Sequence, residues 1–165
     1  MTSPASLQPE PITTERLLLE PLRVGHAEEM AVLLDDVRLH EFTGGEPPTP
    51  DQLRDRYARQ VAGIGRGWLN WVVRHEGAVV GTVQATLEDG VAEVAWVVGT
   101  AHQGRGFAGE AAVGMVGWLR ARGVREVVAH VHPDHRASAA VARRVGLVAS
   151  GVVVDGEVRW VSAER

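Results

Sequence analysis

A glycine-rich turn stands between an apolar run and a helix-like run in the second half of the chain. The apolar run covers residues 94–98, and the turn and the start of the next run contain Gly104, Gly106 and Gly109. Glycines lack a Cβ, so the backbone can come close to a ligand, and the first N–H groups of a helix are unpaired and carry partial positive charge. The sequence therefore predicts that this turn binds an anion such as a phosphate.

The three glycines also match the Gly-x-Gly-x-x-Gly spacing of dinucleotide-binding proteins. That spacing is meaningful only inside a parallel strand-helix-strand unit with an acidic residue about twenty positions further on. Here the strand before the turn ends a series of hairpins, with strands expected at 68–75, 78–87 and 91–98 and Gly-containing turns between them. A nicotinamide dinucleotide is therefore not the ligand that we expect.

The turn has a second interpretation, because it can be written Gln103-x-x-Gly106-x-Ala108. In this form it resembles the acetyl-CoA pyrophosphate loop of the GNAT acetyltransferase superfamily. The resemblance implies that acetyl-CoA binds here as a cosubstrate. The cofactor-binding residues that we infer from it are Trp96, Val97, Val98, Gln103, Gly104, Arg105, Gly106, Phe107, Ala108, His135 and Ser138.

Three other segments carry the same resemblance, and together the matches span about residues 12–162. Residues 93–98 are similar to the family's fourth strand, and residues 137–147 to its later helix and the start of its sixth strand. Residues 13–19 resemble the first strand of the branch that includes ribosomal-protein N-terminal acetyltransferases. The implied fold class is α/β (α+β), with a mixed, mostly antiparallel central sheet of about seven strands and about four helices on its faces.

The hydrophobic periodicity places the remaining elements. Further strands are expected at 16–21, 126–131, 147–154 and 157–161, and helices at 25–35, 51–61, 106–122 and 135–145. Residues 43–50 contain several helix breakers and predict a long loop between the first two helices. In the GNAT family this helix pair and its loop form one wall of the acceptor site. We expect a loose tail at 1–11 and one domain at 12–165.

Composition limits the classes of function. A chain of 165 residues with 45% hydrophobic residues suffices for one compact domain. The absence of cysteine excludes disulfides, thiolate metal ligands and an acyl-cysteine intermediate. A net charge of −4 argues against a general nucleic-acid partner. No run is long enough to span a bilayer, and the first residues lack a signal-peptide pattern, so we expect no membrane partner and a cytoplasmic protein.

The segment from His130 to His135 spells His-x-His-x-Asp-His. This is the zinc-binding signature of hydrolases that resemble metallo-β-lactamases. That fold needs further ligands far downstream, but no histidine follows His135. In the alternative, His130 and His132 share one face of a strand and Asp134 caps the next helix. We favour the alternative, which contains no catalytic metal, over a zinc hydrolase.

The chemistry of acetyl transfer defines what the site must contain. An amine that attacks a thioester needs a base for its proton, donors for the oxygen that becomes negative, and an acid for the departing thiolate. The resemblance implies backbone donors in strand 94–98, for which we choose Val97 and Val98. It implies Glu93 as the base, acting through water, and an ordinary exposed strand carboxylate is the alternative. Glu41, in the acceptor-wall loop, is the second candidate.

The family's usual acid is a tyrosine in the last helix, but the matching position here is Ala142. The one tyrosine, Tyr57, lies in the second expected helix. Ser138 is the fallback donor to the sulfur, although a serine at a helix start is more often a cap. His135 stands where the family has an Asn that contacts the pantetheine arm. These departures keep a non-catalytic acyl-CoA sensor as the alternative to an N-acetyltransferase.

The acceptor stays open among a protein N-terminus, a small polyamine and an amine-bearing antibiotic, and the branch resemblance favours the first. The resemblance also allows a homodimer. Arg105 is our candidate for a phosphate contact, whereas Arg143 and Arg144 fit a solvated helix face equally well. The strand and helix tryptophans are expected in the core. They are Trp68, Trp71, Trp96 and Trp118.

Overall fold

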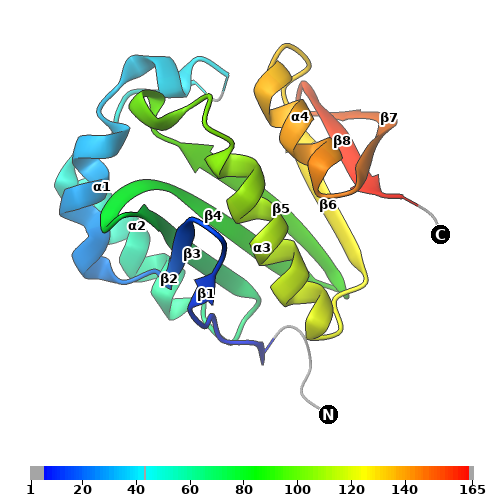
Figure 1. The fold of residues 1–165 in the computed structure, drawn as a ribbon, viewed down its shortest axis with the longest axis horizontal. Helices are drawn as coiled ribbons and strands as arrows, with labels where there is room; N and C mark the ends of the chain where they lie inside the picture. Colours follow the sequence, from blue (N-terminus) through cyan, green and yellow to red (C-terminus); the bar gives the residue numbers. More distant parts are fainter. Residues whose placement is uncertain (1–5, 43, 164–165) are drawn as a thin grey trace.

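The computed structural model describes residues 6–42 and 44–163. An eight-stranded sheet runs through the molecule in the order β1-β2-β3-β4-β5-β6-β8-β7 (Figure 1). The strands are β1 (Ile12–Thr13), β2 (Leu17–Pro21), β3 (Trp68–His75), β4 (Ala78–Glu88), β5 (Val91–Val98), β6 (Glu126–Val131), β7 (Leu147–Val154) and β8 (Glu157–Ser162). The helices are α1 (Ala27–Leu34), α2 (Pro50–Ala62), α3 (Phe107–Ala121) and α4 (Arg136–Arg144), with the short 3-10 turns η2 (Val24–His26), η3 (Val37–His40) and η4 (Thr100–His102).

All neighbouring strands pair antiparallel except β5 and β6, which are parallel. The predicted hairpins are confirmed, and their turns share one conformation. In the turns Glu76-Gly77, Asp89-Gly90 and Asp155-Gly156 both central residues have positive φ, between 51° and 84°. Two-residue hairpins favour this conformation because its twist matches that of the strands, and glycine adopts it without strain.

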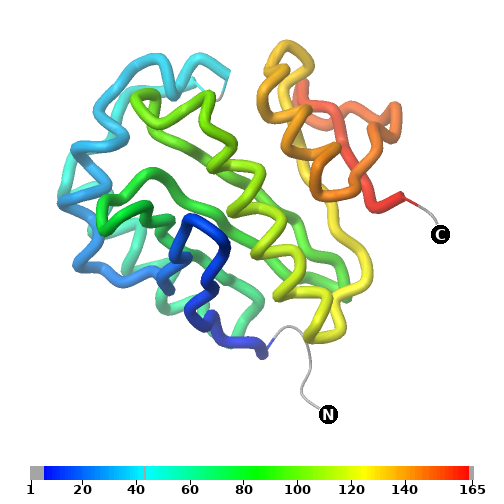
Figure 2. The backbone as a smooth tube through the Cα atoms, viewed as in Figure 1, coloured from blue at the N-terminus to red at the C-terminus, as the bar shows by residue number. Residues whose placement is uncertain are grey.

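Helices cover both faces of the sheet, as Figures 1 and 2 show. Helices α3 and α4 pack on one face over the larger core cluster, which includes Trp71, Phe107 and Leu119. Helices α1 and α2 pack on the other face over a smaller cluster around Met30 and Leu53. Along β5 the side chains alternate between the two faces, so Ala92 and Val94 are buried and Glu93 is exposed.

The predicted elements appear with shifts of one or two residues at their ends. The first predicted helix divides into η2 and α1 at His26, whose Nδ1 accepts a hydrogen bond from the Arg23 N–H at 2.9 Å. Thr49 caps α2 through the Gln52 N–H. The short strand β1 was missed, because two residues carry no periodic signal. The prediction for Trp68 was wrong, because its side chain is 42% exposed, whereas Trp71 and Trp118 are buried as expected.

Part of the expected N-terminal tail contacts the domain. Trp71 Nε1 donates to the backbone oxygen of Glu10 at 2.8 Å, and the Glu10 carboxylate pairs with Arg122 at 2.7 Å. Leu7 packs against the larger core cluster. Residues 1–5 of the expected tail lie outside the described residues. Within the described part of the chain, no helix is long and apolar enough to cross a membrane.

Candidate active site

The central feature of the site is a gap between β5 and β6. The two strands pair at three positions, from Val91 with Glu126 to Glu93 with Val128. Both strands then continue, to Val98 and to Val131. Figure 1 shows them together at one end and apart at the other. The unpaired edge of β5 therefore offers backbone donors and acceptors to a ligand in the gap.

Only alternate residues of β5 turn their backbone groups toward this gap. The Val97 oxygen lies against Gly81 of β4, and the Gly99 N–H donates to the Val80 oxygen at 2.8 Å, so both residues face β4. Neighbouring residues in a strand face opposite edges. Trp96 and Val98 thus face the gap. Of the two predicted donors, Val98 turns its backbone toward the gap, whereas the backbone of Val97 is directed at β4.

Gln103 ties the glycine loop to this edge. Its Nε2 donates to the Val98 oxygen at 2.9 Å, which folds the loop after β5 back onto the strand. This contact of Gln103 with β5 was not predicted from the sequence. It sets the distance between the edge of β5 and the start of α3.

The glycine loop leads directly into α3. Gly104 and Gly106 both have φ of 79°, and Gly106 is the N-terminal capping residue of the helix with no side chain to bond the first N–H groups. A Cβ on Gly104 would meet nothing within 4 Å. Gly109 differs, because a Cβ there would lie 2.5 Å from Arg144 Nη1. The prediction that Gly109 lets a ligand approach was wrong, since this glycine makes room for an arginine.

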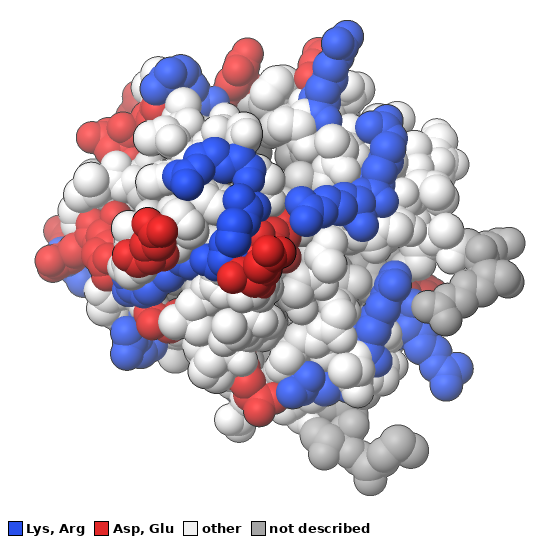
Figure 3. Space-filling model, in the orientation of Figure 1, with Lys and Arg blue, Asp and Glu red and all other residues white. Residues whose placement is uncertain are grey.

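Three arginines surround the start of α3. Arg144 Nη1 donates to the Gly106 oxygen at 3.3 Å, and a Cβ on Gly106 would lie 3.4 Å from Arg16 Nη2. The guanidinium groups of Arg16 and Arg105 lie 4.8 Å and 4.6 Å from the centre of the Phe107 ring. Figure 3 shows basic side chains gathered on this face of the molecule. Phe107 itself is buried, so only its backbone can contact a ligand.

Glu110, in the first turn of α3, holds Arg16 in place. Its carboxylate accepts from Arg16 Nε at 2.7 Å, from the Arg16 N–H at 2.8 Å and from the Thr14 hydroxyl at 2.5 Å. Burial opposes ionisation of Glu110, but these hydrogen bonds outweigh burial and lower its pKa. The side chain therefore stays ionised and fixes an arginine that comes from the other end of the chain.

On the α3 and α4 side of the gap, Ser138 faces β5. Trp96 Nε1 donates to the Ser138 hydroxyl at 3.3 Å, which leaves the hydroxyl hydrogen to donate to another group. The cap of α4 is His135 rather than Ser138 or Asp134, because His135 Nδ1 accepts the Ser138 N–H at 3.2 Å. Burial lowers the pKa of His135, and its ring packs on Phe42 with centroids 4.4 Å apart.

On the opposite face of the sheet, Glu93 pairs with His130. Glu93 Oε1 lies 2.9 Å from His130 Nδ1, and the side chains are 56% and 17% exposed. The contact between Glu93 and His130 was not predicted from the sequence. The signal was present, because both residues occupy the outward positions of the two parallel strands. Glu41 is exposed at the end of η3, next to Phe42, which packs on His132 with centroids 5.0 Å apart, and the charge of Glu41 acts on His135.

The remaining predicted groups have other surroundings. Ala142 is fully buried in the larger core, and Tyr57 packs in the smaller one, where burial raises its pKa to about 12. The three histidines between residues 130 and 135 have different partners. His130 pairs with Glu93, His132 Nδ1 accepts the Asp134 N–H at 3.1 Å, and His135 Nδ1 accepts the Ser138 N–H. In residues 6–42 and 44–163 no group of three or more His, Cys, Asp or Glu could hold a metal ion.

The sequence matches the model of one protein family. A family model described as an acetyltransferase (GNAT) domain matches residues 16–148. No curated protein matches the chain at the sequence level.

Solved structures give the same fold. The chain is similar to RimL, a ribosomal alpha-N-protein acetyltransferase in complex with coenzyme A, with 17% identity, a TM-score of 0.81 and coverage of 92% of this chain and 97% of that one. It is similar to an acetyltransferase from Agrobacterium tumefaciens, with 23% identity, a TM-score of 0.78 and 96% of each chain. It is also similar to a chimera of the Vibrio cholerae spermidine N-acetyltransferase SpeG, with 17% identity, a TM-score of 0.75 and coverage of 90% and 95%.

Proposed function

The chain belongs to the GNAT acetyltransferase family, and on that premise we propose that it transfers an acetyl group from acetyl-CoA directly to a primary amine in the gap between β5 and β6. One observation carries the proposal. Glu93, at the last paired position before the gap, places a carboxylate on one face of the sheet, and Ser138 places a hydroxyl on the other face.

The residues around the start of α3 fit the phosphates of coenzyme A. Helix N-terminal N–H groups, two glycines with positive φ, and the guanidinium groups of Arg16, Arg105 and Arg144 converge there. Anions are stabilised by such N–H groups and by guanidinium donors. Two structural relatives contribute support, because RimL was solved with coenzyme A and the immunity acetyltransferase MccE with acetyl-CoA. The backbone edge at Trp96 and Val98 suits the extended pantetheine arm.

Glu93 is our candidate base, with His130 as its partner. It lies three residues from Trp96 along β5, about 10 Å, so a water or the amine itself must bridge the distance. Glu93 takes a proton from the acceptor ammonium, and the neutral nitrogen then attacks the thioester carbon. The imidazole of His130 orients the carboxylate.

The backbone N–H groups of Trp96 and Val98 lie about 7 Å apart along β5, so one oxygen cannot accept from both. We propose that one of them stabilises the oxygen as it becomes negative and that the other bonds the pantetheine arm. Glu93 has by then released the first ammonium proton to water and is a carboxylate again. As the new C–N bond forms and the C–S bond breaks, the nitrogen therefore loses its second proton to Glu93. The sulfur gains a proton from the Ser138 hydroxyl, which recovers one from water. No enzyme nucleophile is needed, in keeping with a chain that has no cysteine.

We propose a peptide α-amine as the acceptor, a choice supported by the resemblance of residues 13–19 and by the fold likeness to RimL. The non-catalytic sensor is less favoured, because the pair of Glu93 and His130 and the placement of Ser138 both match the needs of the reaction. The test is release of free CoA from acetyl-CoA with a panel of peptides and small amines. Binding of acetyl-CoA without release of CoA for any amine would favour the sensor.

A further inference from the structure

The face of the sheet that carries the pair of Glu93 and His130 also carries a hollow with a volume of about 170 Å³. It is lined by Gln60 of α2, Trp68 and Asn70 of β3, and Gln84 and Thr86 of β4. Trp68 forms one wall, and its ring lies against Gly63 at the end of α2, where any Cβ would collide with it. The hollow is large enough to hold several ordered waters or part of a ligand.

The hollow is neutral and rich in hydrogen-bonding groups. None of its lining side chains is ionised, and four of the five carry an amide or a hydroxyl. Within the described part of the chain these four side chains make no hydrogen bond to the protein. Side-chain amides both donate and accept, so they match the N–H and C=O groups of a peptide backbone.

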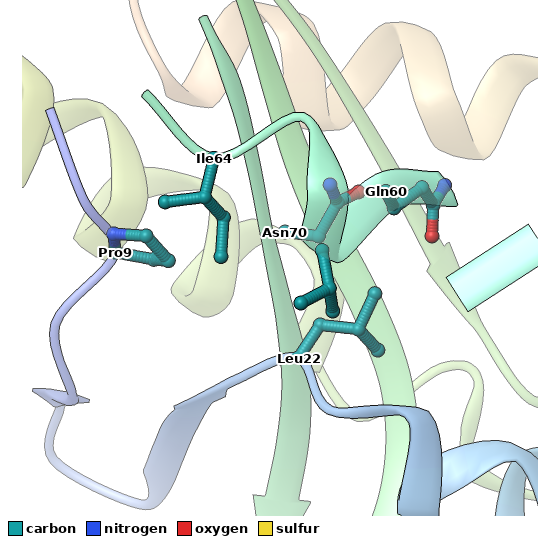
Figure 4. A pocket seen from close by; sticks show the side chains of 6 residues that line it. Pro9, Leu22, Gln60, Ile64 and Asn70 are labelled. Carbon is teal, nitrogen blue, oxygen red and sulfur yellow. The ribbon is translucent and has the colours of Figure 1, made fainter. Parts of the chain in front are cut away.

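A second, mainly apolar hollow adjoins the neutral hollow. It is lined mainly by Pro9, Leu22, Val61 and Ile64, and it shares Gln60 and Asn70 with the neutral hollow. Figure 4 shows the amide of Gln60 pointing away from Pro9 and Ile64. The Gln60 amide is therefore turned from the apolar side and is available to a polar ligand.

The neutral hollow begins next to the candidate base. Thr86 is the cross-strand partner of Glu93, and Trp68 is the cross-strand partner of Thr86. From β5 to β3 the distance is about 10 Å, which corresponds to about three extended residues. Carboxylates near it on this face are Glu93 and, two residues beyond Thr86, Glu88. One ammonium can thus reach Glu93 while the rest of the acceptor meets uncharged groups.

We propose that this hollow is the acceptor subsite and that it selects a peptide whose free α-amine lies at Glu93 and whose first amide groups bond Asn70, Gln84 and Thr86. The inference rests on the proposed function. It excludes polyamines as preferred acceptors, since their additional ammonium groups would lie among side chains that carry no charge.

The test compares three acceptors, which are Ala-Ala-Ala amide, 1-aminooctane and spermidine, with acetyl-CoA at saturation. Alkyl amines and α-amines differ in pKa, so the quantity to compare is the ratio of variant to wild-type kcat/KM for each acceptor. The variants are Gln84→Met and Thr86→Val, which keep size and remove hydrogen bonds. The matched controls are Gln8→Met and Thr13→Val, which make the same changes at exposed positions that do not line the hollow.

We expect each hollow variant to lower kcat/KM for the tripeptide amide about threefold to tenfold and to leave the other two acceptors within about twofold. A loss equal to that of the controls, or one shared by all three acceptors, overturns the subsite while the proposed function stands. If no acceptor releases CoA, the proposed function fails. Calorimetry of the tripeptide amide with the CoA-loaded protein then decides the subsite, which is upheld if the variants weaken binding and overturned if they do not.

Discussion

At the scale of residues, each face of the gap holds one polar group in a defined role. Ser138 accepts the indole N–H of Trp96 and keeps its own hydrogen for the sulfur, while His135 takes over the capping of α4. Ser138 therefore does not cap α4, although capping is the usual role of a serine at a helix start. His135 can serve as this cap because its Nδ1 accepts the backbone N–H of Ser138, as a side-chain amide oxygen would.

Replacing Ser138 by alanine tests its part in proton transfer. A thiolate is a tolerable leaving group and water can protonate it, so we expect Ser138→Ala to lower kcat about tenfold and to leave the affinity for acetyl-CoA unchanged. Steady-state kinetics with calorimetry of CoA binding measures both quantities. Unchanged kcat would show that Ser138 has only a structural place at the start of α4.

The cap predicts a pH dependence of stability. Burial lowers the pKa of His135 below its ordinary value of 6.5. The unfolded chain therefore binds a proton more readily than the folded one, so His135 makes the free energy of unfolding fall as the pH drops below about 6.5. The variant His135→Asn keeps a capping side chain and cannot titrate, so its urea midpoint should change less between pH 7.5 and pH 5.5. An equal change in both proteins would contradict the assignment.

At the scale of elements, the site depends on where α3 and α4 begin. Gly106 caps the N-terminus of α3. Arg144, in the last turn of α4, lies over Gly109 and donates a hydrogen bond to the Gly106 oxygen. This packing couples the phosphate cradle to the helix that carries Ser138. The helix pair α3 and α4 would thus position both the phosphates and the thioester of a bound acetyl-CoA.

Two glycines at the ends of α3 provide a matched test of the cradle. Gly106 and Gly123 have φ of 79° and 95°, so alanine is strained at both. In Gly106→Ala the methyl group also lies near Arg16 and Arg144, whereas at Gly123 it meets nothing within 4 Å. We expect similar losses of stability, and at least a tenfold loss of CoA affinity, about 1.4 kcal/mol, for Gly106→Ala alone. Equal CoA affinities in calorimetry would place the phosphates elsewhere.

Adjacent arginines in α4 give a second test of the cradle. Arg144 contacts the Gly106 oxygen, whereas the Arg143 guanidinium lies 5.2 Å from the centre of the Trp160 ring. Removing one charged hydrogen bond to a phosphate costs about 1.5–3 kcal/mol. Arg144→Gln should therefore weaken CoA binding about tenfold or more, with a reduced dependence on salt, and Arg143→Gln should not. A similar effect of both variants would indicate a general charge effect.

At the scale of the whole molecule, much of the fold follows from local patterns. The Gly turns fixed the three hairpins, and the periodicity located four helices. Arg16 could not be assigned to the site, because its partner Glu110 lies far along the chain, and nothing local in the sequence signals the contact. Gly109 was assigned to the ligand site in error, because the sequence alone does not distinguish a glycine that makes room for a ligand from one that makes room for a packed side chain. The direction of the Val97 backbone likewise depends on the register of β4 against β5.

Acetyl transfer at the gap between β5 and β6 is tested most directly by Glu93→Gln. The measurement is kcat for acetylation of a peptide amine, followed by mass spectrometry, together with calorimetric affinity for acetyl-CoA. The substitution keeps the shape of the side chain and removes its basicity. We predict that kcat falls about 10²-fold while the affinity stays nearly unchanged. Full kcat in Glu93→Gln at neutral pH would contradict the claim and make Glu41 the next base to test.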